Sequence, residues 1–461
     1  MKKVISIALA LLMVAVMLPV MAMAEEPATE LPTADANGVI TLEKDVVLAD
    51  AVEINSDVTI DLHGWSITSS NGNSGKVIIA MANVTIKDSV GNGRIESTST
   101  SGGSSAAIRV GTAGTDKDIT VTIESGTMKG RDCGIFVAGI NSKLVVNGGY
   151  IEGTNGFGVS GNGSMKNDAP ECGPTTITIN GGKIIGGGTG IYHPQVGKLT
   201  INNGEITGKS GIEMRAGELV VNGGVITATG TPLTVNPNGG GSTTVGAAVA
   251  IAQHTTKRPI TVNISGGNFN GPAALNEANP QGNPTEATGN IFIVVTGGTF
   301  NGAVNKAEDG SSLGVMGGTF NTADVTNYVR TFPTVKDENN NYYVGETAEA
   351  VLQSATSGTF TVVGAEEGEA LNVKPGVTIV NNSGVNIKVN GVNVPPHVGG
   401  DGGNNGYVVP NQPIIIYNPT EDTPKANDQK NPGTGANDFV GVAAAMAVVS
   451  LLGAAAVIRK K

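Results

Sequence analysis

The sequence predicts an all-β fold, a right-handed parallel β-helix solenoid, with a signal peptide before it and a C-terminal transmembrane anchor helix after it. A short motif of alternating apolar residues and a glycine turn recurs along the middle of the 461-residue chain. Glycine is unusually frequent, with 68 residues, while aromatic residues make up only 4%. This composition argues against an ordinary mixed globular domain. Both ends of the chain combine apolar runs with basic residues.

The recurring motif sets the length of one turn of the solenoid. Its second turn residue is a glycine, found at Gly149, Gly182, Gly204, Gly224, Gly267, Gly298 and Gly318. These glycines are 33, 22, 20, 43, 31 and 20 positions apart, which indicates a unit of about 20 to 22 residues with insertions and one doubled step. Alternating apolar residues predict two short strands per unit, and several units add a third. So short a unit leaves no room for a covering helix, which favours a β-helix.

Equivalent side chains of successive turns are expected to stack along the solenoid axis, about 4.8 Å apart. An isoleucine two positions after the glycine is replaced in the later units by Phe269, Phe300 and Phe320. Asparagines that precede the glycines should also stack, and we expect them to bond neighbouring backbone at the bends. These asparagines are Asn147, Asn180, Asn202 and Asn222.

The N-terminal half extends the same pattern. The segment VTIDLHGWSI, at residues 58–67, resembles the first complete turn of pectate-lyase-like right-handed β-helix proteins, in which an Asp-Leu-x-Gly step is common. The resemblance covers roughly residues 37–394 and implies a fold rather than one enzyme family. We expect an N-terminal cap, a parallel β-helix, a C-terminal β region and an extended spacer. Their predicted bounds are 25–56, 57–320, 321–394 and 395–430.

The N-terminus has the pattern of an export signal. Lys2 and Lys3 precede an apolar run over positions 4–20, and small residues end at Ala24. This order is typical of a signal peptide cleaved after residue 24. An uncleaved anchor is the alternative, but the apolar run is short for a membrane span of about 20 residues.

The C-terminus predicts a cell-wall anchor. An apolar run over 439–458 is long enough to cross a bilayer, and the basic residues 459–461 after it would stay in the cytoplasm. The segment before the run resembles the signal read by sortases, which cut between Thr and Gly and join the Thr carbonyl to peptidoglycan. Its residues are Asn431, Pro432, Gly433, Thr434 and Gly435. The family usually has Leu where Asn431 stands, so the class of sortase stays open. A plain transmembrane tail is the alternative.

The charge of the exported chain restricts its partners. Residues 25–434 contain 23 basic and 38 acidic side chains, because the removed ends contain five of the 28 Lys and Arg and one of the 39 Asp and Glu. The resulting net charge of −15, without a basic cluster, argues against nucleic acid and anionic membrane surfaces as partners.

The sequence gives no clear metal or cofactor site, and we predict none. Cys133 and Cys172 are too few for a disulfide scaffold; a bridge between them stays open, although the reduced state is favoured. The four histidines are too dispersed for a metal site or catalytic dyad and are expected at the surface or in turns: His63, His193, His254 and His397. Four acids in the loops could bind calcium, and the alternative is that they only keep the surface soluble. These acids are Asp116, Asp118, Asp168 and Glu171.

The third strands contain one group of side chains suited to ligand binding. Aligned on their leading glycines, Phe136, Tyr192 and Glu213 would point outward at equivalent positions, with Arg215 two residues further on. An aromatic ring beside a carboxylate and a guanidinium could hold a sugar. A solvated outer face is the simpler interpretation of the same pattern.

These features favour a surface-anchored, adhesin-like binding or structural protein that presents a rod to glycans or host surface proteins, with sortase and peptidoglycan as further partners. We find no catalytic cluster and name no catalytic residue. The alternative is a wall-attached polysaccharide lyase or glycoside hydrolase whose site residues come from different turns. Cleavage of a polysaccharide would distinguish the two functions.

Overall fold

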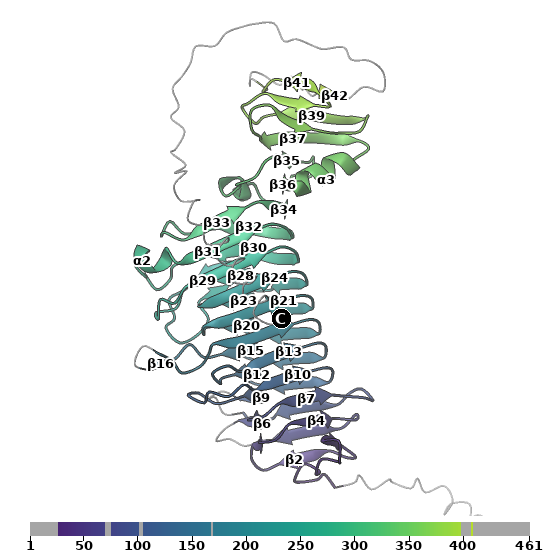
Figure 1. Cartoon of the computed structure of the whole chain (residues 1–461), viewed down its shortest axis with the longest axis vertical. Coiled ribbons are helices and arrows are strands. Elements are labelled where there is room, and N and C mark those ends of the chain that lie inside the picture. Colours follow the sequence, from purple (N-terminus) through teal and green to yellow (C-terminus); the bar gives the residue numbers. More distant parts are fainter. Residues whose placement is uncertain (1–25, 70–74, 101–104, 167–168, 398–406, 409–461) are drawn as a thin grey trace, which may run out of the picture.

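The computed structural model describes residues 26–69, 75–100, 105–166, 169–397 and 407–408. The described chain is all-β, and its strands stack along one long axis in an arrangement consistent with a parallel β-helix (Figure 1). No helix among the described residues is both long and apolar enough to cross a membrane.

Both predicted processing signals fall on parts of the chain that the structure does not describe. The signal peptide predicted for residues 1–24 lies outside the described residues, and so does the sorting signal with its apolar run at 431–461. Most of the expected spacer is outside them as well.

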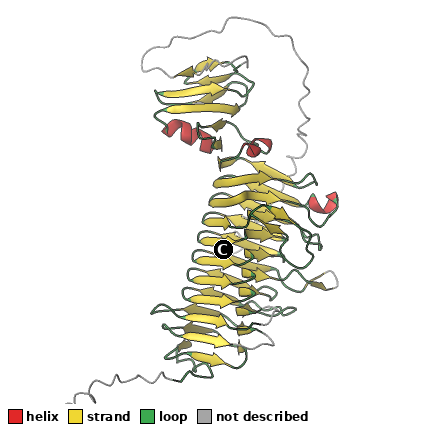
Figure 2. Ribbon diagram, turned by 180° about the vertical axis from the view of Figure 1, so that it is seen from behind, coloured by secondary structure: helices red, strands yellow, loops and turns green. Residues whose placement is uncertain are grey.

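Three columns of strands build the coil, and strands within each column pair in parallel with the equivalent strands of the next turn (Figure 2). The first column consists of β1 (Val39–Thr41), β4 (Val58–Asp61), β7 (Val84–Lys87), β10 (Thr120–Ile123), β13 (Lys143–Val146), β18 (Thr175–Ile179), β21 (Gly197–Ile201), β24 (Gly217–Val221), β29 (Ile260–Ile264), β31 (Ile291–Val295) and β33 (Ser312–Val315). The second contains β2 (Val46–Leu48), β5 (Ser66–Ser69), β8 (Arg94–Ser97), β11 (Thr127–Gly130), β14 (Tyr150–Gly153), β19 (Lys183–Gly186), β22 (Glu205–Gly208), β25 (Val225–Ala228), the first half of β30 (Asn268–Glu277), the first half of β32 (Thr299–Asn305) and β34 (Gly317–Phe320).

The third column contains the predicted site residues Phe136, Tyr192 and Glu213. Its strands are β3 (Val52–Ile54), β6 (Lys76–Ala80), β9 (Ala106–Val110), β12 (Cys133–Val137), β15 (Phe157–Gly161), β20 (Thr189–His193), β23 (Ser210–Met214), β28 (Ala247–Ile251) and the second halves of β30 and β32. Strands β1, β2 and β3 pair in parallel with β4, β5 and β6, so the segment expected as a cap itself contains a turn of the coil.

One predicted feature of the repeat is wrong. The interval of 43 residues is not a doubled step, because Leu219 of β24 pairs directly with Val262 of β29. Most of the extra length is an insertion over residues 229–246, which contains the antiparallel hairpin β26 (Thr234–Val235) and β27 (Thr244–Val245). The interval between two glycines does not distinguish a doubled repeat from an inserted loop, because a loop outside the ladder can lengthen without disturbing the register. Two other long turns hold the hairpin β16 (Met165–Lys166) and β17 (Ala169–Pro170), and the helix α2 (Thr285–Thr288).

The three-column coil ends at β34, which pairs in antiparallel fashion with a strand of the C-terminal β region. This region has its own core, which includes Val335, Leu352, Phe360 and Ile379. Its elements are η1 (Ala323–Asn327), β35 (Thr334–Lys336), β36 (Tyr342–Gly345), α3 (Glu346–Ser354), β37 (Gly358–Gly364), β38 (Glu369–Leu371), β39 (Val377–Asn381), β40 (Ile387–Val389), β41 (Val392–Val394) and β42 (Tyr407–Val408).

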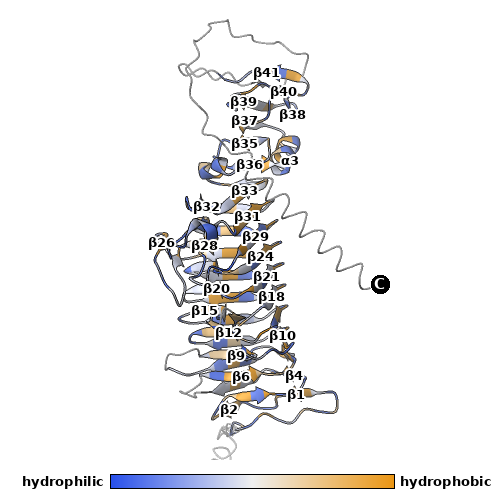
Figure 3. Ribbon diagram, turned by 60° about the vertical axis from the view of Figure 1, so that its left-hand side comes forward, coloured by the Kyte–Doolittle hydropathy of each residue, from blue (hydrophilic) through white to orange (hydrophobic). Residues whose placement is uncertain are grey.

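Stacked side chains stabilise the coil inside and at its bends. Hydrophobic positions recur from turn to turn (Figure 3). In the second column the rings of Phe269, Phe300 and Phe320 stack with centroids 4.6 Å apart at both steps, as predicted. The predicted asparagine column also forms, but its bonds differ from those expected. Each of Asn180, Asn202 and Asn222 donates its side-chain amide to the side-chain oxygen of the preceding asparagine at 2.8 Å, rather than to backbone.

Replacing Phe300 tests how much the ring column stabilises the coil. We expect Phe300→Ala to lower the free energy of unfolding by about 3 to 5 kcal/mol, because it removes a fully buried ring and leaves a cavity between two others. The measurement is urea denaturation followed by circular dichroism. Val90→Ala is the control, since Val90 is 64% exposed. Equal effects of the two substitutions would contradict this role of the column.

Candidate functional site

The register of the third column brings the predicted site residues together. Phe136 pairs with Ser160, Ser160 with Tyr192, and Tyr192 with Glu213, each on the strand of the next turn. These side chains alternate with fully buried residues of the core such as Ile191, so they point away from the coil interior. This is the alignment that the leading glycines predict.

The site is not the solvated outer face that the sequence favoured. Tyr192 is only 4% exposed, and Glu213 and Arg215 are completely buried. The insertion at 229–246 supplies the cover, because its residues hydrogen-bond to Glu213 and Arg215, and Arg215 in turn donates to the Tyr192 hydroxyl at 3.4 Å. The expectation was wrong for a physical reason: nothing in the period of the repeat indicates onto which face an insertion folds.

Glu213 is held by the end of the insertion. Its carboxylate accepts hydrogen bonds from the Ser242 hydroxyl, from the Thr243 backbone N–H at 2.8 Å and from the Thr243 hydroxyl at 2.8 Å. Burial raises the pKa of Glu213, while these hydrogen bonds and the positive charge of Arg215 oppose the rise. The insertion therefore provides the donors that a buried carboxylate needs.

Arg215 is held by backbone carbonyls. Its guanidinium donates to the carbonyls of Asn238 at 2.9 Å, of Gly241, and of Ala252 at 3.0 Å. Arg215 Nε also lies 4.0 Å from a carboxylate oxygen of Glu213. Together the two side chains clamp the insertion onto the coil, so neither is available to an external ligand.

An open groove of about 530 Å³ lies beside this clamp. Its aromatic residues are Phe136, Phe157 and Tyr192, and the rings of Phe157 and Tyr192 stack with centroids 4.7 Å apart. Burial raises the pKa of the Tyr192 hydroxyl to about 12, so this group stays protonated. Glycines and a histidine of later turns also line the groove. The polar and later-turn residues of the lining include Asp132, Ser160, Asn162, Ser164, Gly239, Gly240 and His254.

Sequence reasoning missed Phe157. It stands just before Gly158, which takes the place of the leading glycine of the other third strands. Its paired residues on the neighbouring turns, Cys133 and Thr189, are not aromatic. The available signal was the motif GFGVSG, in which an aromatic residue stands at the start of a third strand.

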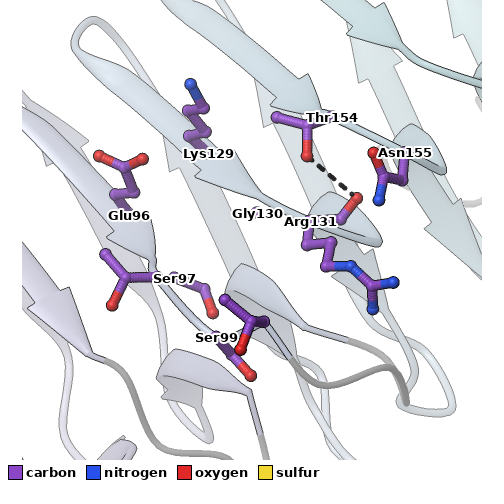
Figure 4. Close-up of a pocket in the computed structure, with 10 residues that line it drawn as sticks. Glu96, Ser97, Ser99, Lys129, Gly130, Arg131, Thr154 and Asn155 are labelled. Carbon is purple, nitrogen blue, oxygen red and sulfur yellow. Dashed lines mark hydrogen bonds between the residues drawn. The ribbon is translucent and has the colours of Figure 1, made fainter.

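A second hollow of about 250 Å³ lies next to the groove and shares Asn155 with it. Its lining is polar and charged, with Glu96, Lys129, Arg131 and Thr154 (Figure 4). Lys129 forms an ion pair with Glu152 at 3.5 Å, and Arg131 lies 3.6 Å from the Asp132 carboxylate. The charges of this hollow are therefore largely compensated within the protein.

The other predicted site residues do not converge. Asp116 accepts a hydrogen bond from Asn141, Asp118 pairs with Lys143, and Asp168 lies outside the described residues. Glu171 joins no acidic cluster, because the described part of the chain holds no group of three or more His, Cys, Asp or Glu residues suited to a metal ion.

The two cysteines form no disulfide, and the histidines differ in their burial. Cys133 and Cys172 are both free and buried, and burial raises the pKa of Cys133 to about 12. His193 is not at the surface or in a turn as expected. It is fully buried in β20, and burial lowers its pKa to about 4, so its ring is neutral at pH 7. His254, in contrast, lines the groove, and its Nε2 atom lies 2.9 Å from the Gly239 carbonyl oxygen.

No family model, curated protein or solved structure matches this chain.

The clamp can be tested by removing one of its charges. We expect Glu213→Gln to lower the free energy of unfolding by about 3 kcal/mol, because Arg215 would lose its buried counter-charge. Limited proteolysis should then cut faster within 229–246. The matched control is Glu218→Gln, since Glu218 pairs with Lys198 at the surface and should contribute less than about 1 kcal/mol. Small, equal effects and unchanged proteolysis would show that the clamp does not hold the insertion.

Proposed function

We propose that this chain is an exported surface protein that binds a glycan in the groove beside the Glu213–Arg215 clamp. The observation that carries the proposal is the stacked pair of Phe157 and Tyr192, with Phe136 on a neighbouring turn of the same face. Aromatic rings offer a rigid apolar surface on which the C–H face of a sugar can pack.

The polar residues of the groove suit the hydroxyl groups of the same ligand. Asp132 provides a carboxylate acceptor, Asn162 both donors and an acceptor, and Ser160 and Ser164 hydroxyls that can do either. A volume of about 530 Å³ also falls within the range of small-ligand sites. Apolar rings with a few convergent polar groups are the composition expected of such a site.

Binding without cleavage is the function that this chemistry favours. A glycosidase of the usual kind needs two carboxylic acids on either side of the scissile bond. Among the described residues that line the groove, Asp132 is the only acid. Glu213 and Arg215, the charged residues expected beside the aromatic ring, are bonded to the insertion instead. The alternative of a lyase or hydrolase therefore has less support than that of a binding protein.

The cellular setting completes the proposal. A signal peptide over 1–24 would export the chain, and its right-handed, pectate-lyase-like coil would stand on a spacer over 395–430. A sortase would cut between Thr434 and Gly435 and join the chain to peptidoglycan. The acidic charge and the sorting motif of the sequence support this arrangement. The glycan partner would then lie outside the cell.

The groove assignment predicts the effect of removing one ring. A glycan array should first identify an oligosaccharide that binds the wild-type chain. Phe157→Ala should then weaken its binding by at least about tenfold, the equivalent of 1.4 kcal/mol, because it removes the ring of the stacked pair that stays partly exposed, Tyr192 being buried. Trp65→Ala is the control, since Trp65 is an aromatic residue that is 40% exposed but not part of the groove lining. Equal losses in both variants, or none in Phe157→Ala, would argue against this groove.

The anchor is tested separately in the bacterium that produces the chain. In the wild type, digestion of purified walls with a muramidase should release the protein with peptidoglycan fragments attached. Thr434→Ala removes the residue whose carbonyl would form the new bond and should abolish this covalent attachment. Asn427→Ala, outside the motif, should leave it unchanged. Wall attachment of the Thr434→Ala protein would contradict the sorting assignment.

A further inference from the structure

A buried acid, Glu277, and a partly buried one, Asp309, lie in the last turns of the coil, outside the groove and the clamp. Glu277 ends β30 and is only 2% exposed. Its Oε2 atom accepts hydrogen bonds from the Ser311 hydroxyl at 2.8 Å and from the Ala307 backbone N–H at 2.9 Å. Its Oε1 atom is also buried and has no hydrogen-bond partner. A buried carboxylate oxygen without a partner is strongly unfavourable.

Asp309 presents the same feature in the loop between β32 and β33. Its Oδ1 atom accepts a hydrogen bond from the Ser311 backbone N–H at 3.0 Å, while its Oδ2 atom is buried without a partner. Ser311 thus holds both acids, one through its hydroxyl and the other through its backbone. The loop is tied down further by the Thr288 hydroxyl, which donates to the Asp309 carbonyl.

The charges around this pair do not neutralise it. Among the described residues, no ion pair joins Glu277 or Asp309 to a basic group within 4.0 Å. Lys306 is close enough to act on Glu277, but its ammonium group donates to the Ala307 carbonyl at 2.6 Å. Burial, with the negative charge of Asp309 added to it, raises the pKa of Glu277 to about 7. A positive charge between the two acids would relieve both problems.

We propose that Glu277 and Asp309 bind a divalent cation of the Ca²⁺ type through their unpartnered oxygens. Ca²⁺ prefers oxygen ligands and accepts irregular coordination, whereas Mg²⁺ requires a near-ideal octahedron. Two carboxylates fill part of its shell, and backbone carbonyls or waters would supply the rest. The cation would fix the loop over 306–311 against β30 and so stabilise the end of the coil. This proposal is independent of glycan binding.

Equilibrium dialysis and thermal unfolding of the full chain at pH 8, after chelator treatment, test the proposal. Dialysis against radioactive Ca²⁺ should find one bound ion per chain. Calcium at about 100 times its Kd should raise the melting temperature by about 5 °C, and Mg²⁺ at the same concentration should raise it less.

Two neutral variants locate the site. Glu277→Gln and Asp309→Asn should each lose the bound ion and the Ca²⁺-dependent rise. Without Ca²⁺, Glu277→Gln should melt higher than the chelated wild type, because it removes a buried charge; this also shows that the variant folds. Glu205→Gln, at a surface ion pair with Lys183, should respond to Ca²⁺ as the wild type does. No bound ion in the wild type, or an unchanged Ca²⁺ response in both variants, would overturn the proposal.

Discussion

The parallel, in-register pairing of successive turns is the constraint on which the rest of this structure depends. Because each strand hydrogen-bonds to the equivalent strand of the next turn, one favourable side-chain contact becomes a column of them. The stacked rings of Phe269, Phe300 and Phe320 and the amide chain from Asn147 to Asn222 are such columns. The same register aligns Phe136, Ser160 and Tyr192 on the outer face, so the fold itself assembles the groove.

Insertions give successive turns of this regular coil their structural differences. The segment at 229–246 leaves the ladder and returns to it in register, which allows it to fold over β20 and β23. It buries Glu213 and Arg215 and provides backbone N–H groups and carbonyls that hydrogen-bond to both side chains. The same segment places Gly239 and Gly240 at the edge of the groove. A buried ion pair of this kind is better evidence that one conformation of the loop is favoured than that the folded chain gains stability.

The sequence predicts the side-chain columns that follow from the repeat period, but it does not predict the contacts that the insertions make. The phenylalanine and asparagine columns, and the shared outer face of Tyr192 and Glu213, follow from spacing alone. The burial of Arg215 does not, because its partners Asn238 and Gly241 belong to a loop without a repeat. His193 stands two positions after Ile191, so the alternation that points Tyr192 outward points His193 inward, and the surface assignment overlooked this. The hydrogen bond between Glu277 and Ser311 is likewise missed, because Ser311 belongs to the irregular loop between β32 and β33.

The central claim of this account is that the groove binds a glycan and leaves it intact. The direct test is to incubate the chain, with and without calcium, with the polysaccharide that it binds, and to measure the length distribution of the recovered polymer by size-exclusion chromatography and mass spectrometry. We predict that bound polymer is recovered at its original length under both conditions. Release of shorter oligosaccharides would contradict the account and would make this protein a polysaccharide-degrading enzyme.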